Sequence, residues 1–152
     1  MKKKIILGLA AVIVLIQFIP VERSNPAVEG EIVAPPEVMA VLARACYDCH
    51  SNHTEWPWYA YVAPVSWLLA RDVSEGRHEL NFSTWGAYGA KQKRKKLKET
   101  AEEVAEGEMP PWYYALVHAE ARLSPGEHEA LRAWTAEEIA RLAPPATVTA
   151  PE

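Results

Sequence analysis

The sequence contains no internal repeat, and no stretch alternates apolar and polar residues for long enough to form a sheet. Cysteine is scarce: Cys46 and Cys49 are the only two, so neither has another partner in the chain. Positive charge is not in excess, because the formal net charge is −4, and this composition does not favour binding to nucleic acid or to an anionic membrane surface. What is present is a chain of 152 residues, enough for one compact domain once the two ends are set aside.

The N-terminus has the pattern of an export signal. Lys2 to Lys4 precede an apolar run from Ile5 to Pro20, and no small-x-small cleavage site follows this run. Its length is at the lower edge of the roughly 17–25 residues that cross a bilayer, so residues 1–21 are interpreted as either a signal peptide or a membrane anchor. Because the lysines come first, the positive-inside rule places the rest of the chain outside the cytoplasm. We expect an exported protein, periplasmic or at the outer face of the inner membrane.

Composition divides the rest of the chain into three parts. Residues 22–36 are rich in proline and charge and predict an extended linker. Residues 37–142 carry the apolar periodicity of a folded domain. Residues 143–152 have no apolar period and predict a disordered tail.

The periodicity within the domain is helical and predicts an all-α fold. The expected helices are residues 38–45, residues 65–75 closed by Gly76, residues 90–106 closed by Gly107, and residues 124–142 with Ser124 as the N-cap. Residues 56–64 and 109–123 are expected to be irregular connections. Long connections of this kind are uncommon in a compact domain, and a buried prosthetic group would organise them.

Residues 46–50 read Cys-Tyr-Asp-Cys-His, which is the C-x-x-C-H pattern of covalent c-type haem attachment. Two thiols three positions apart at the end of a helix face the same side, so each can form a thioether with one vinyl group. The adjacent His50 is then carried beneath the ring, where its imidazole can bind the iron. The sequence therefore predicts one haem c held by Cys46 and Cys49, with His50 as an axial ligand.

Three other interpretations of these residues compete. A thioredoxin-type redox pair needs a βαβ context, which the sequence does not show. A disulfide between Cys46 and Cys49 would close a very small loop and add little stability. A zinc site from these cysteines with His50 and His53 has suitable ligand types, but the immediate Cys-His adjacency does not match the spacing of zinc modules.

Met109 is the predicted sixth ligand of the iron. Pro110 moves Met109 out of the helical region of backbone conformation. Pro110 and Pro111 each fix their own φ angle, so Met109 is followed by two rigid residues. A thioether on such a rigid segment, placed after C-x-x-C-H and before the last helix, is how cytochromes c supply their second ligand. The alternatives are that Met109 fills a gap in the core, or that His118 binds the iron instead.

Aromatic side chains are expected to form the walls of the haem site. Trp56, Trp58 and Trp112, together with Tyr59 and Trp67, offer large apolar areas with a polar group at the edge. Ordinary core packing is the competing interpretation for each of them.

Several segments resemble those of a known family. They are residues 46–52 (CYDCHSN), 56–59 (WPWY), 63–67 (APVSW), 81–83 (NFS) and 107–112 (GEMPPW). Over about residues 25–142 the chain resembles the bacterial haem-binding domain family, which comprises small cytochrome-c-like proteins. The resemblance implies a cytochrome-c-like helical domain wrapped around a single haem, and it implies no particular reaction.

Basic residues crowd the run from Lys91 to Lys98, in the first half of the third predicted helix, and acidic residues crowd the second half. This order opposes the helix dipole, which favours acids first and bases last. A solvated helix face is one interpretation. A docking patch for an acidic redox partner is the other, because complementary charge speeds encounter.

Taken together, these features favour a one-electron carrier over an enzyme. Both axial positions of the iron would be filled, by His50 and Met109, so no substrate could react at the metal. Two rival functions remain open, a peroxidase-like haem enzyme with an open iron site and a redox or gas sensor in which Met109 leaves the iron.

Overall fold

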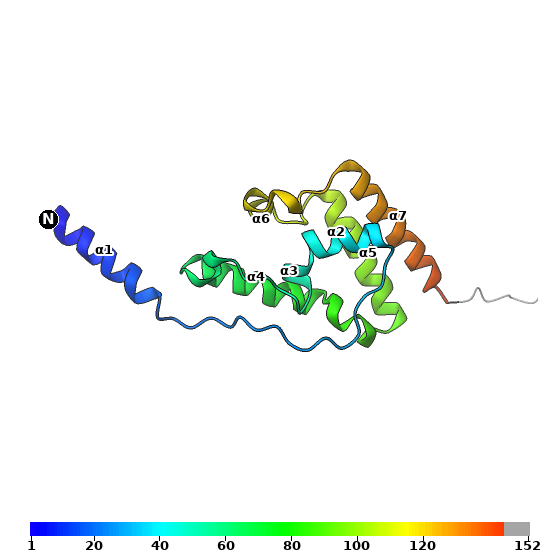
Figure 1. Cartoon of the computed structure of the whole chain (residues 1–152), viewed down its shortest axis with the longest axis horizontal. Helices are drawn as coiled ribbons and strands as arrows, with labels where there is room; N and C mark the ends of the chain where they lie inside the picture. Colours follow the sequence, from blue (N-terminus) through cyan, green and yellow to red (C-terminus); the bar gives the residue numbers. More distant parts are fainter. Residues whose placement is uncertain (145–152) are drawn as a thin grey trace, which may run out of the picture.

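The computed structural model describes residues 1–144, and among these it contains helices and no β-strand, which confirms the predicted all-α class. The helices, in chain order, are α1 (Lys2–Ile16), α2 (Pro36–Ala45), α3 (Tyr47–His50), η1 (Trp58–Tyr61), α4 (Val65–Glu79), η2 (Phe82–Ala87), α5 (Ala90–Glu106), α6 (Trp112–Val117), η3 (Ala119–Ala121) and α7 (Pro125–Arg141). In Figure 1, α5 and α7 lie on one side of the domain, and α4 and α6 lie on the side nearer to α1. Of the tail expected to be disordered, residues 145–152 lie outside the described residues.

Local signals set the ends of the two longest helices of the domain. Gly107 ends α5 with φ of 78°, a left-handed conformation that glycine adopts without steric cost. Ser124 caps α7: its hydroxyl accepts from the Glu127 N–H at 3.3 Å, and the Glu127 carboxylate accepts from the Ser124 N–H at 2.7 Å. The predicted N-cap at Ser124 and the predicted end at Gly107 are both confirmed.

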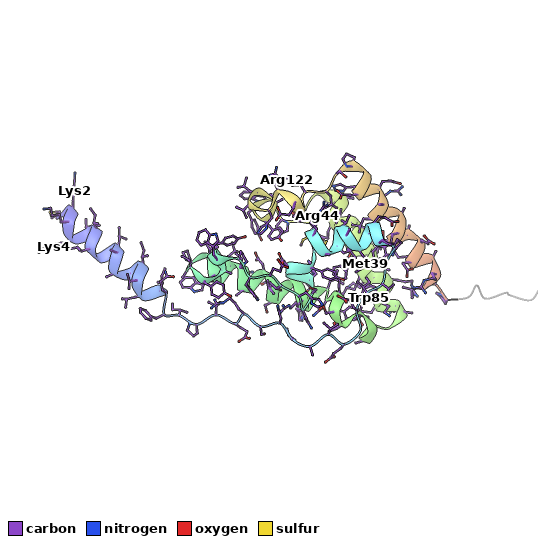
Figure 2. The ribbon with its side chains drawn as sticks, viewed as in Figure 1. Lys2, Lys4, Met39, Arg44, Trp85 and Arg122 are labelled. Atoms are coloured by element: carbon purple, nitrogen blue, oxygen red, sulfur yellow. The ribbon has the colours of Figure 1, made fainter. Side chains whose placement is uncertain are left out.

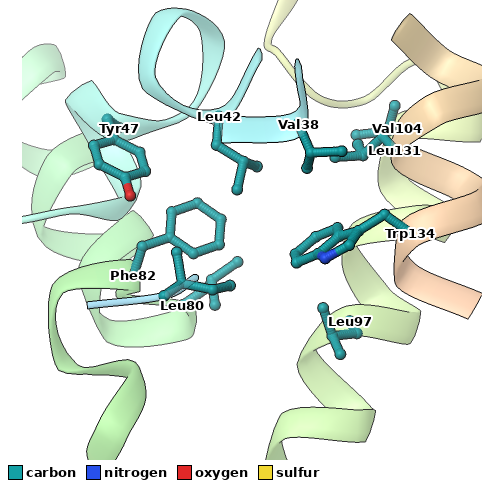
Figure 3. Packing of buried hydrophobic residues seen from close by; sticks show 10 residues of the cluster. Val38, Leu42, Tyr47, Leu80, Phe82, Leu97, Val104, Leu131 and Trp134 are labelled. Carbon is teal, nitrogen blue, oxygen red and sulfur yellow. The ribbon is translucent and has the colours of Figure 1, made fainter. Parts of the chain in front are cut away.

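The core lies where α2, α5 and α7 meet (Figure 3). Leu42 of α2, Leu97 of α5 and Leu131 of α7 are each at most 2% exposed. Phe82 and Leu80 close the core from the side of α4 and η2, and Trp134 of α7 faces them across it. Burial of this apolar surface is the main force that holds these three helices together.

Two expectations about helix boundaries are wrong. The second helix does not stop at Gly76, and α4 continues to Glu79. Gly76 does not form a turn; it lies where α4 passes close to α3. The connections 56–64 and 109–123 are not wholly irregular, because they contain η1, α6 and η3. Helices of three to six residues are too short to show an apolar period in the sequence.

The segment expected to be a linker, residues 22–36, is extended but packs against the domain. Ile32 is 3% exposed and belongs to the core cluster, and its N–H donates to the Phe82 carbonyl at 3.0 Å. The Glu29 N–H donates to the Ser83 carbonyl at 2.9 Å. The folded part of the chain therefore includes residues that composition alone assigned to a tether.

Arg77 of α4 fastens this segment. Its guanidinium group donates to the carbonyls of Ser24 and Ser51, each at 2.7 Å, to Asn25 Oδ1 at 2.8 Å and to Thr54 Oγ1 at 2.9 Å. The planar guanidinium group, with its five N–H donors, suits donation to several acceptors at once. One side chain thus ties the N-terminal segment to the turn that follows α3.

Helix α1 extends away from the domain, with the N-terminus at its far end (Figure 1). Its apolar side chains are exposed, and none of its residues is buried. Among the helices formed by residues 1–144, none has the length and apolarity needed to cross a membrane.

Candidate functional site

A cavity of about 480 Å³ lies between α3, α4, α5 and the segment that leads into α6. Pockets for small molecules and cofactors usually have volumes of roughly 300–1,000 Å³. Cys46, Cys49, His50 and Met109 all line this cavity. The structure therefore brings together the four residues that the sequence assigned to covalent attachment and axial ligation, although they come from two distant parts of the chain.

The two thiols lie on a single helical turn. The Cys46 carbonyl accepts from the N–H groups of Cys49 at 3.2 Å and His50 at 2.9 Å, which closes the turn of α3. Both cysteines are free rather than joined in a disulfide. Burial raises the pKa of each thiol to about 12, so both groups are neutral S–H at physiological pH.

The ring of His50 is oriented by the backbone of α4. Its Nδ1 lies 2.9 Å from the Gly76 carbonyl oxygen and 3.1 Å from the Leu80 carbonyl oxygen. Carbonyl oxygens only accept, so Nδ1 carries the proton and Nε2 keeps a free lone pair. Burial lowers the pKa of His50 and favours this neutral form. The arrangement is that of a metal-binding histidine whose other nitrogen is fixed by a backbone acceptor.

Gly76 allows α4 to approach α3 closely. A methyl group at this position would lie 2.6 Å from the Cys49 carbonyl oxygen and 3.2 Å from Cys49 Cβ. Any larger side chain would push α3 away and change the position of the carbonyl that orients His50. The sequence predicts a helix stop at this glycine, and a glycine inside a helical pattern is the only signal in the sequence for a close contact.

Met109 reaches the cavity from the segment that follows α5. Its N–H donates to the Glu103 carbonyl at 3.2 Å, which holds the start of the segment on the end of α5. The side chain is 36% exposed, and Pro110 and Pro111 line the cavity beside it. Met109 therefore fills no gap in the core and forms part of the cavity wall.

The aromatic wall differs from the one expected from the sequence. Tyr113 and Tyr114 of α6 line the cavity, and their hydroxyls donate to Asp72 Oδ2 at 3.1 Å and to Asp48 Oδ2 at 2.7 Å. These bonds join α6 to α4 and α3. Phe82 also contributes to the lining. The tyrosines directly follow the Met-Pro-Pro segment, and that adjacency was the signal that could have identified them.

The structure places the expected tryptophans away from the cavity. Trp58 is 78% exposed and Trp112 is 75% exposed, and each is the first residue of its helix. Trp56 lines a separate small cavity with Ser74 and Arg77. Aromatic composition alone does not tell which residues of an aromatic segment face the cavity. In residues 112–114 the two tyrosines line it and the tryptophan does not.

Carboxylates outnumber basic groups around the cavity. Lys96 is the basic residue of its lining, and the acidic residues are Asp48, Asp72, Glu75, Glu79, Glu99 and Glu103. Lys96 Nζ lies 3.7 Å from Glu79 and 3.8 Å from Glu99. Burial raises the pKa of Asp72, whose carboxylate is partly shielded from solvent.

Basic residues in the run Lys91–Lys98 form ion pairs with acidic residues one turn further along α5. Lys95 pairs with Glu99 at 3.3 Å, and Lys98 pairs with Glu102 at 3.2 Å, both at the i, i+4 spacing. Such pairs favour a helix by a few tenths of a kcal/mol, roughly 0.2–0.5 each, and offset the unfavourable order of charge along the dipole.

The competing ligand sets are not assembled. His53 lies near Glu31 at 3.3 Å, and His118 contacts Tyr59 and Glu120 and does not line the cavity. Within residues 1–144, no group of three or more histidine, cysteine or acidic side chains is arranged to hold a metal ion by itself. A zinc site of the type considered from the sequence is therefore not formed.

The comparisons with known proteins give one result. The model of a family described as a haem-binding domain matches residues 11–137, well over half of the chain. No curated protein and no solved structure matches the chain.

Proposed function

This chain belongs to the haem-binding domain family, and we propose that it holds one haem c covalently through Cys46 and Cys49 and acts as a one-electron carrier. The family supports haem as the cofactor. The observation that carries the finer proposal is the meeting of both thiols, His50 and Met109 at one cavity of suitable size.

The two thiols are suited to covalent attachment. Each S–H would add across one vinyl C=C bond, with sulfur going to one carbon and hydrogen to the other, so the addition needs no oxidant or reductant. Because Cys46 and Cys49 lie on one turn of α3 and both line the cavity, both bonds can form to the same ring.

His50 and Met109 are suited to fill the two axial positions. His50 presents Nε2 because Nδ1 donates to backbone carbonyls, which also fixes the plane of the ring. Met109 supplies a soft thioether from the far end of α5. Haem supplies an iron that gains or loses one electron, and two protein ligands would leave no open position for a substrate.

Other residues of the lining would hold and surround the group. Phe82 and the prolines after Met109 offer apolar contacts. Lys96 is the basic lining residue available to a propionate. Tyr113 and Tyr114 keep α6 over the cavity through their bonds to Asp72 and Asp48. Apolar side chains against the haem would limit its contact with water, and exclusion of water raises the potential of a haem iron.

We place this activity outside the cytoplasm. The lysines at the start of the chain and the apolar run after them support export. The redox partner would be a separate protein, and the run Lys91–Lys98 remains a candidate contact for an acidic one.

The experiment that tests the proposal is extraction of the haem with acidified acetone. Haem should stay with the parent polypeptide and also with a Met39→Leu control, which keeps both thiols. The Cys46→Ala, Cys49→Ala double variant should release its haem completely. If haem leaves the parent as readily as it leaves the double variant, the attachment is not covalent and the proposal is wrong.

A further inference from the structure

Two neighbouring ends of the domain expose apolar side chains that no part of residues 1–144 covers. We call them the apolar tips; the first comprises Trp58, Tyr61, Val62, Val65 and Leu68, and the second comprises Trp112, Leu116 and Val117. Trp58 and Trp112 are 78% and 75% exposed, and Leu116 and Val117 are each 64% exposed. Gathered apolar surface of this kind marks an interaction site in a soluble domain.

Contacts between η1 and the segment around α6 join the two tips. The Tyr59 hydroxyl hydrogen-bonds to the His118 ring, and the two rings meet edge to face. The His118 ring also stacks on Tyr114 with ring centroids 4.2 Å apart. These contacts hold the two tips next to each other.

Helix α1 leaves the domain near the first tip. The Gln17 side chain both donates to the Ala63 carbonyl at 3.2 Å and accepts from the Ala63 N–H at 2.9 Å. Arg23 donates to the Ala60 carbonyl at 3.2 Å and lies over the Tyr61 ring at 4.5 Å. These contacts fix the end of α1 beside the first tip.

The remainder of α1 points away from the domain, and Lys2 and Lys4 lie at its far end (Figure 2). Between these lysines and Gln17, the apolar side chains of the helix are exposed; Ile5, Leu7 and Leu15 each expose 61% or more. An apolar helix with exposed sides and a positive far end is suited to lipid rather than to water.

We infer that the apolar tips rest on the surface of a lipid bilayer, with Trp58 and Trp112 inserted beside α1. Tryptophan is favoured at membrane–water interfaces because it is apolar over most of its surface and has one polar N–H. The proposal requires α1 to enter lipid and does not require it to cross. It is independent of haem, because neither tryptophan lines the cavity.

The test uses the full-length protein with vesicles of phosphatidylcholine, with and without bromine on the acyl chains. Bromine quenches the fluorescence of tryptophans that touch the hydrocarbon. Zwitterionic lipid removes electrostatic attraction of the N-terminal lysines, so quenching reports apolar insertion. The ratio of emission in the two kinds of vesicle also cancels any constant quenching by haem.

The parent should be quenched by brominated lipid, and a Trp58→Phe, Trp112→Phe double variant should lose most of this quenching. Trp85→Phe is the matched control, because Trp85 packs against the core and Lys93 on the side away from α1 (Figure 2), and it should keep the quenching of the parent. Both target tryptophans are exposed, so phenylalanine there does not threaten folding.

Two results would overturn the proposal. Equal quenching in the parent and the double variant would mean that the tips stay in water while α1 alone binds. Protection of Trp58 and Trp112 from both brominated lipid and aqueous acrylamide would mean that a second copy of the chain covers the tips.

Discussion

Replacing Gly76 with alanine should destabilise the protein, even though alanine is the better helix former. The added methyl group would lie 2.6 Å from the Cys49 carbonyl oxygen, and ordinary contacts begin at 3.4 Å, so α3 would have to move by 0.8 Å. The obstacle is backbone, which cannot turn aside as a side chain can. The shift would also change the 2.9 Å bond from His50 Nδ1 to the Gly76 carbonyl.

Two opposing effects set the size of this loss. Alanine favours a helix over glycine by about 1 kcal/mol. Overfilling a close contact costs about 1–3 kcal/mol. Because the neighbouring atom is backbone at much less than contact distance, we expect the upper part of this cost and a net loss of about 2 kcal/mol. For a domain of this size the melting temperature would fall by about 8 °C, at about 4 °C per kcal/mol.

Thermal unfolding followed by circular dichroism measures this change, with Gly126→Ala as the matched control. Gly126 lies in α7, and a methyl group there would meet no atom within 4 Å. The control should be as stable as the parent or slightly more stable. If Gly76→Ala behaves like Gly126→Ala, the close approach of α3 and α4 does not exist, and the orientation of His50 has another cause.

Four further predictions concern the ligands, the pH dependence and the location of the protein. His50→Ala should abolish the low-spin absorption spectrum of the haem protein, whereas His53→Ala, which alters a histidine outside the cavity, should leave it unchanged. Met109→Leu should lower the reduction potential and allow carbon monoxide to bind, while Met39→Leu should do neither; rapid binding of the gas by the parent would instead favour a sensor or a peroxidase. Burial lowers the pKa of His50 below its ordinary 6.5, so in the haem-free chain this histidine should take up a proton on unfolding near pH 6.5. The free energy of unfolding should therefore fall as pH drops through that value. An equal fall in a haem-free His50→Gln variant would assign the effect to other groups. Cell fractionation should find the haem-loaded protein outside the cytoplasm, and haem-loaded protein confined to the cytosol would contradict export by residues 1–21.

Features that depend on neighbours in the sequence were predictable. The end of α5 at Gly107 and the start of α7 at Ser124 follow from residues within one turn of each boundary. The meeting of Cys46, Cys49 and His50 follows from their spacing. Even the approach of Met109 to the same cavity could be inferred, because the prolines after it leave the segment few conformations.

Features that depend on distant residues were not predictable. Gly76 looks like a helix stop until the Cys49 carbonyl is placed beside it. Trp58 and Trp112 look like cofactor walls until the direction of each helix is known, and the structure turns both outward. Residues 22–36 look like a slack tether, because nothing nearby in the sequence shows that Arg77 binds their backbone.

Because Arg77 binds the N-terminal segment, the position of a cut in that segment decides whether the domain keeps its contacts. A protease that cleaves just before Ser24 would release a fragment that keeps both backbone carbonyls bound by Arg77 and also keeps Ile32 in the core. A cut just before Pro36 would remove Ile32 and leave the guanidinium group with fewer acceptors, beside the turn that follows α3. The smallest stable form of this domain thus begins well before its first core helix. A fusion protein or a natural variant that begins at α2 would lose these contacts.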